Sequence, residues 1–356
     1  MEPPKFKYPT TSFRTDLRKR INDYFSEIQS KPTGNYKLYF KAVFLLLSYT
    51  GIYIHLVFFT SSYTVLNISE CILLGGLCAG IGFNVMHDGA HGSFSQHKWI
   101  NNLAGLSLNF LGANVFMWKT KHNVIHHTYT NIAEVDDDLN ARPFLRLCEA
   151  QKPYKIHRFQ HMYFWLVYSF LYFWWVFVTD YRKYFTQKIG VIPVRNMEIS
   201  DHLLFWGFKA LHLVLFVIIP IQYVGFSVWL IGFLTYAFSA GFVLSLVFQL
   251  AHSVQGTDFP TPNTDTGNIE EVWIVHQLKT TANFATKNKI VSWFTGGLNY
   301  QIEHHLFPGI SHVHYPALRR IVKQACQEYN LPYLEFPNVR LAIASHIAHL
   351  KHVGNL

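Results

Sequence analysis

Four long apolar stretches set the first limit on what this chain can fold into. A helix that crosses a bilayer needs about 20 mostly apolar residues, and stretches of this kind cover residues 42–60, 66–86, 203–221 and 226–251. Of the 356 residues, 50% are hydrophobic and 14% are charged, whereas soluble domains carry about 25% charged residues. The sequence therefore predicts an all-α integral membrane protein with about four transmembrane helices.

Two further apolar stretches are less suited to crossing a bilayer. Residues 162–179 are rich in Tyr, Phe and Trp, as segments at the membrane–water interface are. Residues 103–118 form a short stretch that contains glycine. We expect the first stretch to lie on the membrane surface, and the second to be an interfacial or re-entrant segment.

The distribution of basic residues predicts the orientation of the spans. The links 61–66 and 222–225 contain no Lys or Arg, whereas the segment before the first span and residues 181–202 are basic. Cytoplasmic loops carry the excess of Lys and Arg, so both basic segments are expected in the cytoplasm. If residues 162–179 crossed the membrane, the basic loop after them would lie outside, which favours the interfacial interpretation.

This orientation predicts a simple domain organisation with both termini in the cytoplasm. Residues 1–41 are polar and basic and lack the short apolar core of a signal peptide. We expect them to form a cytoplasmic tail, with one membrane domain over residues 42–356. Its cytoplasmic cap would comprise residues 87–202 and 252–356.

Three clusters of histidine lie beside the predicted spans, all on the predicted cytoplasmic side. Residues four apart on a helix share a face, so the rings within a cluster can point toward one place. Seven clustered histidines exceed the four ligands of a structural zinc ion, and we expect two metal ions. The seven residues are His87, His91, His122, His126, His127, His304 and His305.

Other polar residues are candidates for supporting roles. His252, at the cytoplasmic end of the last span, is a plausible eighth ligand, and His276 is a weaker candidate. Carboxylates commonly orient metal-binding imidazoles through the second ring nitrogen. Asp88 and Glu303 are expected in that role. Residues 136–138, all aspartates, could act likewise or form a solvated loop or helix cap.

The donor set favours iron among the metals that bind imidazole. Imidazole suits zinc, copper, iron and nickel, but the sequence has no His-Glu-x-x-His motif of a hydrolytic zinc site. Soluble di-iron bundles use several glutamates, and carboxylates are few here. Two metals in a nitrogen-rich shell beside lipid suit oxygen chemistry, and we expect two iron ions with O2 as co-substrate.

At these residues the sequence resembles the membrane-bound fatty acyl desaturase family. Residues 296–308, Gly-Gly-Leu-Asn-Tyr-Gln-Ile-Glu-His-His-Leu-Phe-Pro, resemble the front-end subgroup, in which glutamine replaces the first histidine of the third cluster. The resemblance implies an oxygen-dependent enzyme that inserts a cis double bond between an existing one and the carboxyl end of a lipid-linked or CoA-linked acyl chain. It also implies that the seven clustered histidines and His252 bind the two irons. Gln301 could ligate through its oxygen, hold a water or shape the pocket.

One departure from that resemblance bears on the partners. Many eukaryotic front-end desaturases carry a fused cytochrome b5 domain with a His-Pro-Gly-Gly motif, which is absent here. We therefore expect no fused haem domain and a separate electron donor, either ferredoxin or cytochrome b5 with its reductase. This favours a bacterial inner membrane, with the endoplasmic reticulum as the alternative. The net charge of +9 suits anionic lipid headgroups, whereas no nucleic-acid-binding pattern is present.

Two other functions compete with desaturation. The same metal site could hydroxylate a lipid or convert it to a ketone, because substrate orientation decides the outcome. A histidine-liganded metal transporter is a less favoured alternative, since transport sites lie near the bilayer midplane and the clusters lie beyond the span ends.

Overall fold

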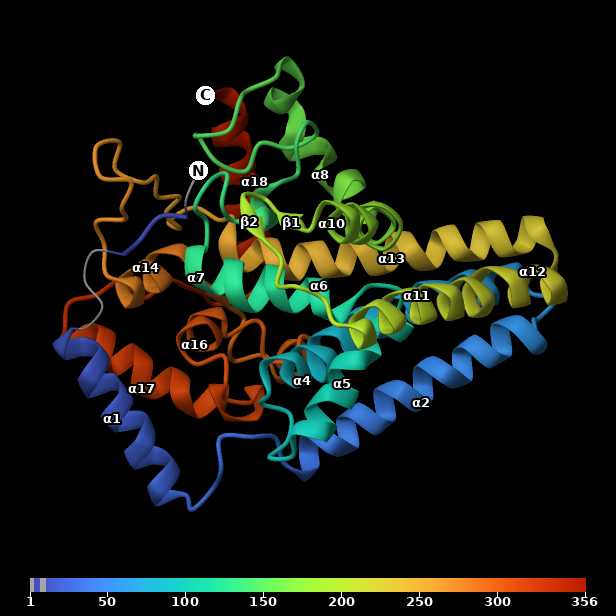
Figure 1. Cartoon of the computed structure of the whole chain (residues 1–356), viewed down its shortest axis with the longest axis horizontal. Coiled ribbons are helices and arrows are strands. Elements are labelled where there is room, and N and C mark those ends of the chain that lie inside the picture. The colour runs from blue at the N-terminus through green and yellow to red at the C-terminus, as the bar shows by residue number, and fades with distance from the viewer. Residues whose placement is uncertain (1–2, 7–10) are drawn as a thin grey trace.

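The computed structural model describes residues 3–6 and 11–356 and is mainly helical (Figure 1). Its longest helices are apolar and lie side by side, and they extend away from a cap of shorter helices and loops. Four helices are long and apolar enough to span a membrane, namely Tyr36–Phe58, Thr64–His91, Ile199–Val224 and Phe226–His252. The predicted all-α class and the number of spans are confirmed.

Two of the four candidate spans contain a π-helical turn. These are the second and third spans. The first span, α2 (Tyr36–Phe58), and the fourth span, α13 (Phe226–His252), are single α-helices. The label η marks a short π- or 3-10 helix. The second span joins α3 (Thr64–Ile81), η1 (Gly82–Met86) and α4 (His87–His91), and the third joins α11 (Ile199–Leu213), η6 (Val214–Ile218) and α12 (Ile219–Val224).

Close packing of α3 against α13 forms the centre of the membrane region. A Cβ atom on Gly75 would lie 2.6 Å from the carbonyl oxygen of Tyr236, so only glycine permits this approach of the two helices. Leu74 and Cys78 of α3 belong to the same buried apolar cluster as Ala240 of α13. The span that ends in the first histidine cluster is thereby fixed against the span that ends at His252.

The aromatic stretch 162–179 lies in two helical halves that meet at a bend. The segments Lys155–Ser169 and Leu171–Thr186 are bent by 57° relative to each other, and they form a further candidate span only when taken together. They comprise η4 (Lys155–Phe159), α8 (Gln160–Ser169), α9 (Leu171–Trp174), η5 (Trp175–Thr179) and α10 (Asp180–Thr186).

The remaining elements make up most of the cap. The helices are α1 (Ser12–Glu27), α5 (Lys98–Phe110), α6 (Val115–Lys119), η2 (Thr120–His126), α7 (His127–Tyr129), η3 (Asp137–Leu139), α14 (Trp273–Thr280), α15 (Lys289–Phe294), α16 (Gln301–Leu306), η7 (His312–His314), α17 (Tyr315–Glu328) and α18 (Val339–Asn355). The short strands β1 (Lys188–Ile189) and β2 (Ile192–Pro193) pair antiparallel, and β3 (Asn283–Phe284) and β4 (Glu335–Phe336) pair parallel.

The segment expected to be an N-terminal tail is a packed part of the fold over much of its length. Helix α1 buries Phe13, Leu17 and Ile21 in one apolar cluster with Leu318 and Val322 of α17, and the two helices lie side by side in Figure 1. Helix α2 also begins before residue 42. The three core residues of α1 recur every fourth position, the spacing of one helix face, but the polar and basic residues between them led to the prediction of a tail.

Candidate metal centre

The first histidine cluster ends the second span and is pressed against α5. A Cβ atom on Gly89, between the two histidines, would lie 2.7 Å from the Cβ of Ala104. Only glycine lets α4 approach α5 this closely. The π-helical turn η1 directly precedes α4, and such turns are common beside functional sites. His87 is buried, and His91 is partly buried on the next turn.

Two histidines of the second cluster, His122 and His126, lie on a π-helix rather than on the α-helix assumed from their spacing, and His127 begins α7. Asn114 caps α6 by accepting a hydrogen bond from the backbone N–H of Met117 at 3.1 Å, and the helix continues into η2. A π-helix holds more residues per turn, which changes the directions of His122 and His126 relative to an α-helix. The ring of His122 stacks on that of Trp118, with centroids 4.3 Å apart.

The third histidine cluster is positioned by a tight turn and by a buried carboxyl group. Gly296 and Gly297 both have positive φ angles, 59° and 71°, and they lead into α16. The Glu303 carboxyl group accepts hydrogen bonds from the Asn283 amide and the Tyr333 hydroxyl, both at 2.8 Å. Burial raises the pKa of Glu303 to about 7. Glu303 therefore anchors the helix that carries the histidines through Asn283 and Tyr333, and not through a hydrogen bond to an imidazole as expected.

The structure brings all eight predicted ligands together in one buried cluster. Among the described residues, four overlapping sets of side chains each have possible ligand atoms within 4.8 Å of one another, and two of these sets together contain seven of the eight histidines. We call them group A (His87, His91, His122 and His304) and group B (His126, His252 and His305). His127 links the two groups, because its possible ligand atom lies within 4.8 Å of those of His304 and His305, and His122 and His126 form a further such set with Asp138.

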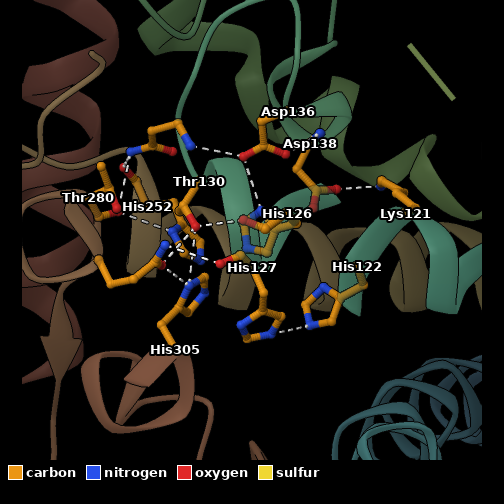
Figure 2. Close-up of polar contacts among 12 residues, drawn as sticks. Lys121, His122, His126, His127, Thr130, Asp136, Asp138, His252, Thr280 and His305 are labelled. Atoms are coloured by element: carbon orange, nitrogen blue, oxygen red, sulfur yellow. Dashed lines mark hydrogen bonds and ion pairs between the residues drawn. The ribbon is translucent and has the colours of Figure 1, made fainter. Parts of the chain in front are cut away.

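Each ring of group B is held by an oxygen acceptor at Nδ1 (Figure 2). The Nδ1–H of His126 donates to Asp136 at 3.0 Å, and that of His252 donates to the Thr280 carbonyl at 3.2 Å. The Nδ1–H of His305 donates to the Gln277 side chain at 2.8 Å. Each Nε2 therefore points into the cluster, the arrangement typical of metal-binding histidines; that of His126 has no partner among the described residues, and those of His252 and His305 face the Gln301 amide.

The rings of group A are held differently. The Nδ1 of His304 lies 3.1 Å from the Tyr315 hydroxyl, and Nε2 of His87 faces Nε2 of His122 at 3.3 Å. Nε2 of His91 has no hydrogen-bond partner among the described residues. The His122 ring also stacks on that of Trp118, and its Nε2 lies 3.2 Å from Nε2 of His127.

The chemistry of the cluster fits metal ions. Among the described residues, the buried Nε2 atoms of His126 and His304 and Nδ1 of His127 have no hydrogen-bond partner. Such orphaned polar atoms are costly without a ligand. Burial and the neighbouring imidazoles hold the pKa values of His122, His127, His304 and His305 well below their usual range. Neutral imidazole is the form that binds metal.

The acidic loop at residues 136–138 is a part of this site rather than a solvated surface loop. Asp136 is 3% exposed and bonds His126. Asp138 pairs with Lys121 and lies 3.3 Å from Nδ1 of His126, and Asp137 pairs with Lys183 at 2.7 Å. Burial disfavours a charge on His126, but Asp136 and Asp138 outweigh it and raise the pKa of His126.

Three of the remaining candidates lie at different positions relative to the cluster. Gln301 directs its amide nitrogen toward Nε2 of His252 and of His305, at 2.8 and 3.3 Å, and its oxygen has no partner. Asp88 lies 3.9 Å from Nδ1 of His87. His276 is buried against Phe6 and belongs to neither group, and burial lowers its pKa to about 4.

Sequence reasoning missed several residues that support the ligands. Thr130 contacts Nδ1 of His305 at 3.2 Å, and Trp273 donates a hydrogen bond to the backbone carbonyl of His127 at 3.1 Å. Tyr315 and Gln277, which contact Nδ1 of His304 and of His305, were not among the predicted site residues either. Thr130 carries no sequence signal of its own.

Comparison with known proteins agrees with this geometry. The family described as fatty acid desaturase matches residues 61–337. The chain is 36% identical to a sn-1 linoleoyl-lipid 6-desaturase of Synechocystis sp., over 96% of this chain and 95% of the relative. It is 34% identical to a sn-1 linoleoyl-lipid 6-desaturase of Arthrospira platensis (96% and 92% covered) and to an acyl-lipid (8-3)-desaturase of Physcomitrium patens (95% and 71% covered). The chain therefore belongs to the fatty acid desaturase family.

Proposed function

We propose that this protein is an oxygen-dependent desaturase that inserts a cis double bond into an acyl chain carried by a membrane lipid. The observation that carries the proposal is the convergence of eight histidines at one end of the spans, seven of them in groups A and B and the eighth, His127, between the groups. Both groups are composed mainly of imidazole nitrogens, which suit iron. Two iron ions bound there would supply the reduction of O2.

The reaction balances with an external supply of electrons. The acyl chain loses one hydrogen from each of two adjacent methylene groups. With O2, two electrons and two protons, the products are one double bond and two waters. The protein must position one pair of methylene groups, because a small displacement along the chain would select another carbon. The expected donor is a separate protein, ferredoxin or cytochrome b5 with its reductase.

We further propose front-end regiochemistry and an acyl-lipid substrate. Two relatives are named 6-desaturases of a linoleoyl lipid, and carbon 6 of a linoleoyl chain lies between the carboxyl group and its first double bond. The glutamine in the third histidine cluster supports the same subgroup. Acyl-CoA is the alternative carrier.

The proposed orientation places both termini and the histidine cluster in the cytoplasm. Four spans return the chain to its starting side, and the basic segments before α2 and after α10 favour the cytoplasm for that side. The bent pair of helices from α8 to α10 would then lie at the interface. A bacterial inner membrane is favoured over the endoplasmic reticulum.

The decisive experiment is expression in a host without polyunsaturated lipids, supplied with linoleate. Mass spectrometry should find a new double bond on the carboxyl side of the existing one, and the His305→Ala variant should lack it. Pulse labelling should find the product first in membrane lipid rather than in acyl-CoA. A hydroxylated acid, or no product despite bound iron and a supplied donor, would refute desaturation.

A further inference from the structure

A buried chain of polar side chains joins the start of the first span to the first histidine cluster. Nζ of Lys41, on α2, lies 2.9 Å from Nε2 of His312. Nδ1 of His312 lies 3.0 Å from Oδ2 of Asp88, and Oδ1 of Asp88 lies 3.9 Å from Nδ1 of His87. Lys41 and His312 are 7% and 5% exposed, so water has little access to this chain.

The hydrogen bonds that join Lys41, His312 and Asp88 can be donated in one direction only. The Lys41 ammonium group has donors and no acceptor, so Nε2 of His312 must accept its hydrogen bond. The proton of the neutral His312 ring is then on Nδ1, where it is donated to Asp88. The Ser311 hydroxyl donates to the same Asp88 oxygen at 2.7 Å.

This arrangement leaves the second oxygen of Asp88 for His87. With Oδ2 occupied by two donors, Oδ1 faces Nδ1 of His87. At 3.9 Å this oxygen is beyond hydrogen-bond distance, but its negative charge favours the ring proton on Nδ1 and so leaves Nε2 of His87 to ligate. Nε2 of His87 is also the atom that faces His122, at 3.3 Å.

Stability alone does not account for a lysine at this position. Lys41 lies beside Leu38, Ala42 and Leu45 in the apolar part of α2, and replacing buried charged groups by apolar ones of similar volume is often neutral or stabilising. Its other contacts are the carbonyl oxygen of Trp293 at 3.3 Å and the face of the Trp293 ring. What a methionine could not supply is the donor to His312.

We propose that Lys41 and His312 are positioning residues for the ligand His87. They act through Asp88, whose orientation they fix, and they keep Nε2 of His87 directed into group A. The inference rests on the proposed metal-dependent function, but it concerns metal binding and can be tested apart from the product.

The test uses the purified full chain in detergent, loaded with ⁵⁷Fe, with iron counted per chain and its sites resolved by Mössbauer spectroscopy. Lys41→Met should weaken binding at one iron site by about 10–100-fold, the effect of losing an outer partner of a ligating histidine, and should change that site's signal alone. Lys41→Arg, which keeps a charged donor, should retain iron at both sites. Lys37→Met, on the exposed residue one turn earlier in α2, is the matched control.

A second pair of variants keeps the test sharp if Lys41→Met does not yield a monodisperse protein. His312→Asn retains an N–H donor for Asp88 and should keep more iron than His312→Leu, which has none. Unchanged iron content and unchanged signals in Lys41→Met, or equal loss in the two His312 variants, would overturn the proposal. Two bound irons without any lipid product in the wild type would refute the proposed function and leave this inference standing.

Discussion

The two groups of histidines are fixed by different means, although they share one buried cluster. Every ring of group B donates Nδ1–H to an oxygen, and one of these oxygens is the Asp136 carboxylate. Group A relies on the Tyr315 hydroxyl, on stacking against Trp118 and on a longer contact of His87 with Asp88. Group B is therefore the more preorganised site, and group A has more freedom to adjust during the reaction.

The largest effect should come from a residue that serves both groups. His304 is fully buried and belongs to group A, and its possible ligand atom lies within 4.8 Å of those of His127 and His305. We expect His304→Ala to lose the product entirely and to lower iron content at both sites. Iron analysis and lipid profiling check this, with the exposed His352→Ala as control. Retention of two irons would contradict the linked arrangement.

The next effect tests the charged partner of group B. Asp136→Asn keeps the size of the side chain but removes the charge beside His126, and we expect about a 10–100-fold loss of iron affinity or activity. The measurement is iron retention against a graded series of chelator concentrations. Asp265→Asn, on an exposed loop, should behave as the wild type. An equally small effect of both variants would argue against a role for Asp136.

A smaller effect is expected for the neutral partner of group A. Tyr315→Phe removes one uncharged hydrogen bond to His304, worth about 1 kcal/mol or roughly fivefold in affinity. The same chelator series measures it, together with the relative turnover. If Tyr315→Phe lowered iron affinity more than Asp136→Asn, group A rather than group B would be the more preorganised site.

The smallest expected effect is a difference in the rate at which the two proposed irons of the unmodified protein are released. Because group A is held less firmly, its iron should be released first when a chelator is added, with a rate severalfold above that of group B. Mössbauer spectra taken during chelation would show one signal fading before the other. Simultaneous loss of both signals would indicate that the groups act as one unit.

The sequence predicted the parts of this molecule that repeat a simple pattern. Long apolar stretches predicted the four spans, and closely spaced histidines predicted the cluster. The exact helical form of the second cluster was not predicted, because a π-helix in η2 and an α-helix have the same histidine spacing in the sequence. The packing of α1 on α17 was hidden by its few apolar residues.

The partners of the ligands were harder to predict for a different reason. Lys41 and His312 are 271 residues apart in the chain, and Thr130 meets His305 across 175 residues. Contacts of this kind depend on the three-dimensional arrangement of the spans and leave no local pattern. Asp136 was a candidate only because it stands in an acidic run beside the second cluster.

The assembly of the cluster from distant segments also bears on how fast the protein is degraded in the cell. Its rings come from α4, η2 with α7, α16 and the end of α13, so bound iron would tie together the ends of two spans and two segments of the cap. Without iron, the buried nitrogens that have no partner would destabilise these segments and favour local opening that exposes them to proteases. We expect cells starved of iron to lose the enzyme by degradation, so that the unsaturation of their membranes would recover only after new synthesis.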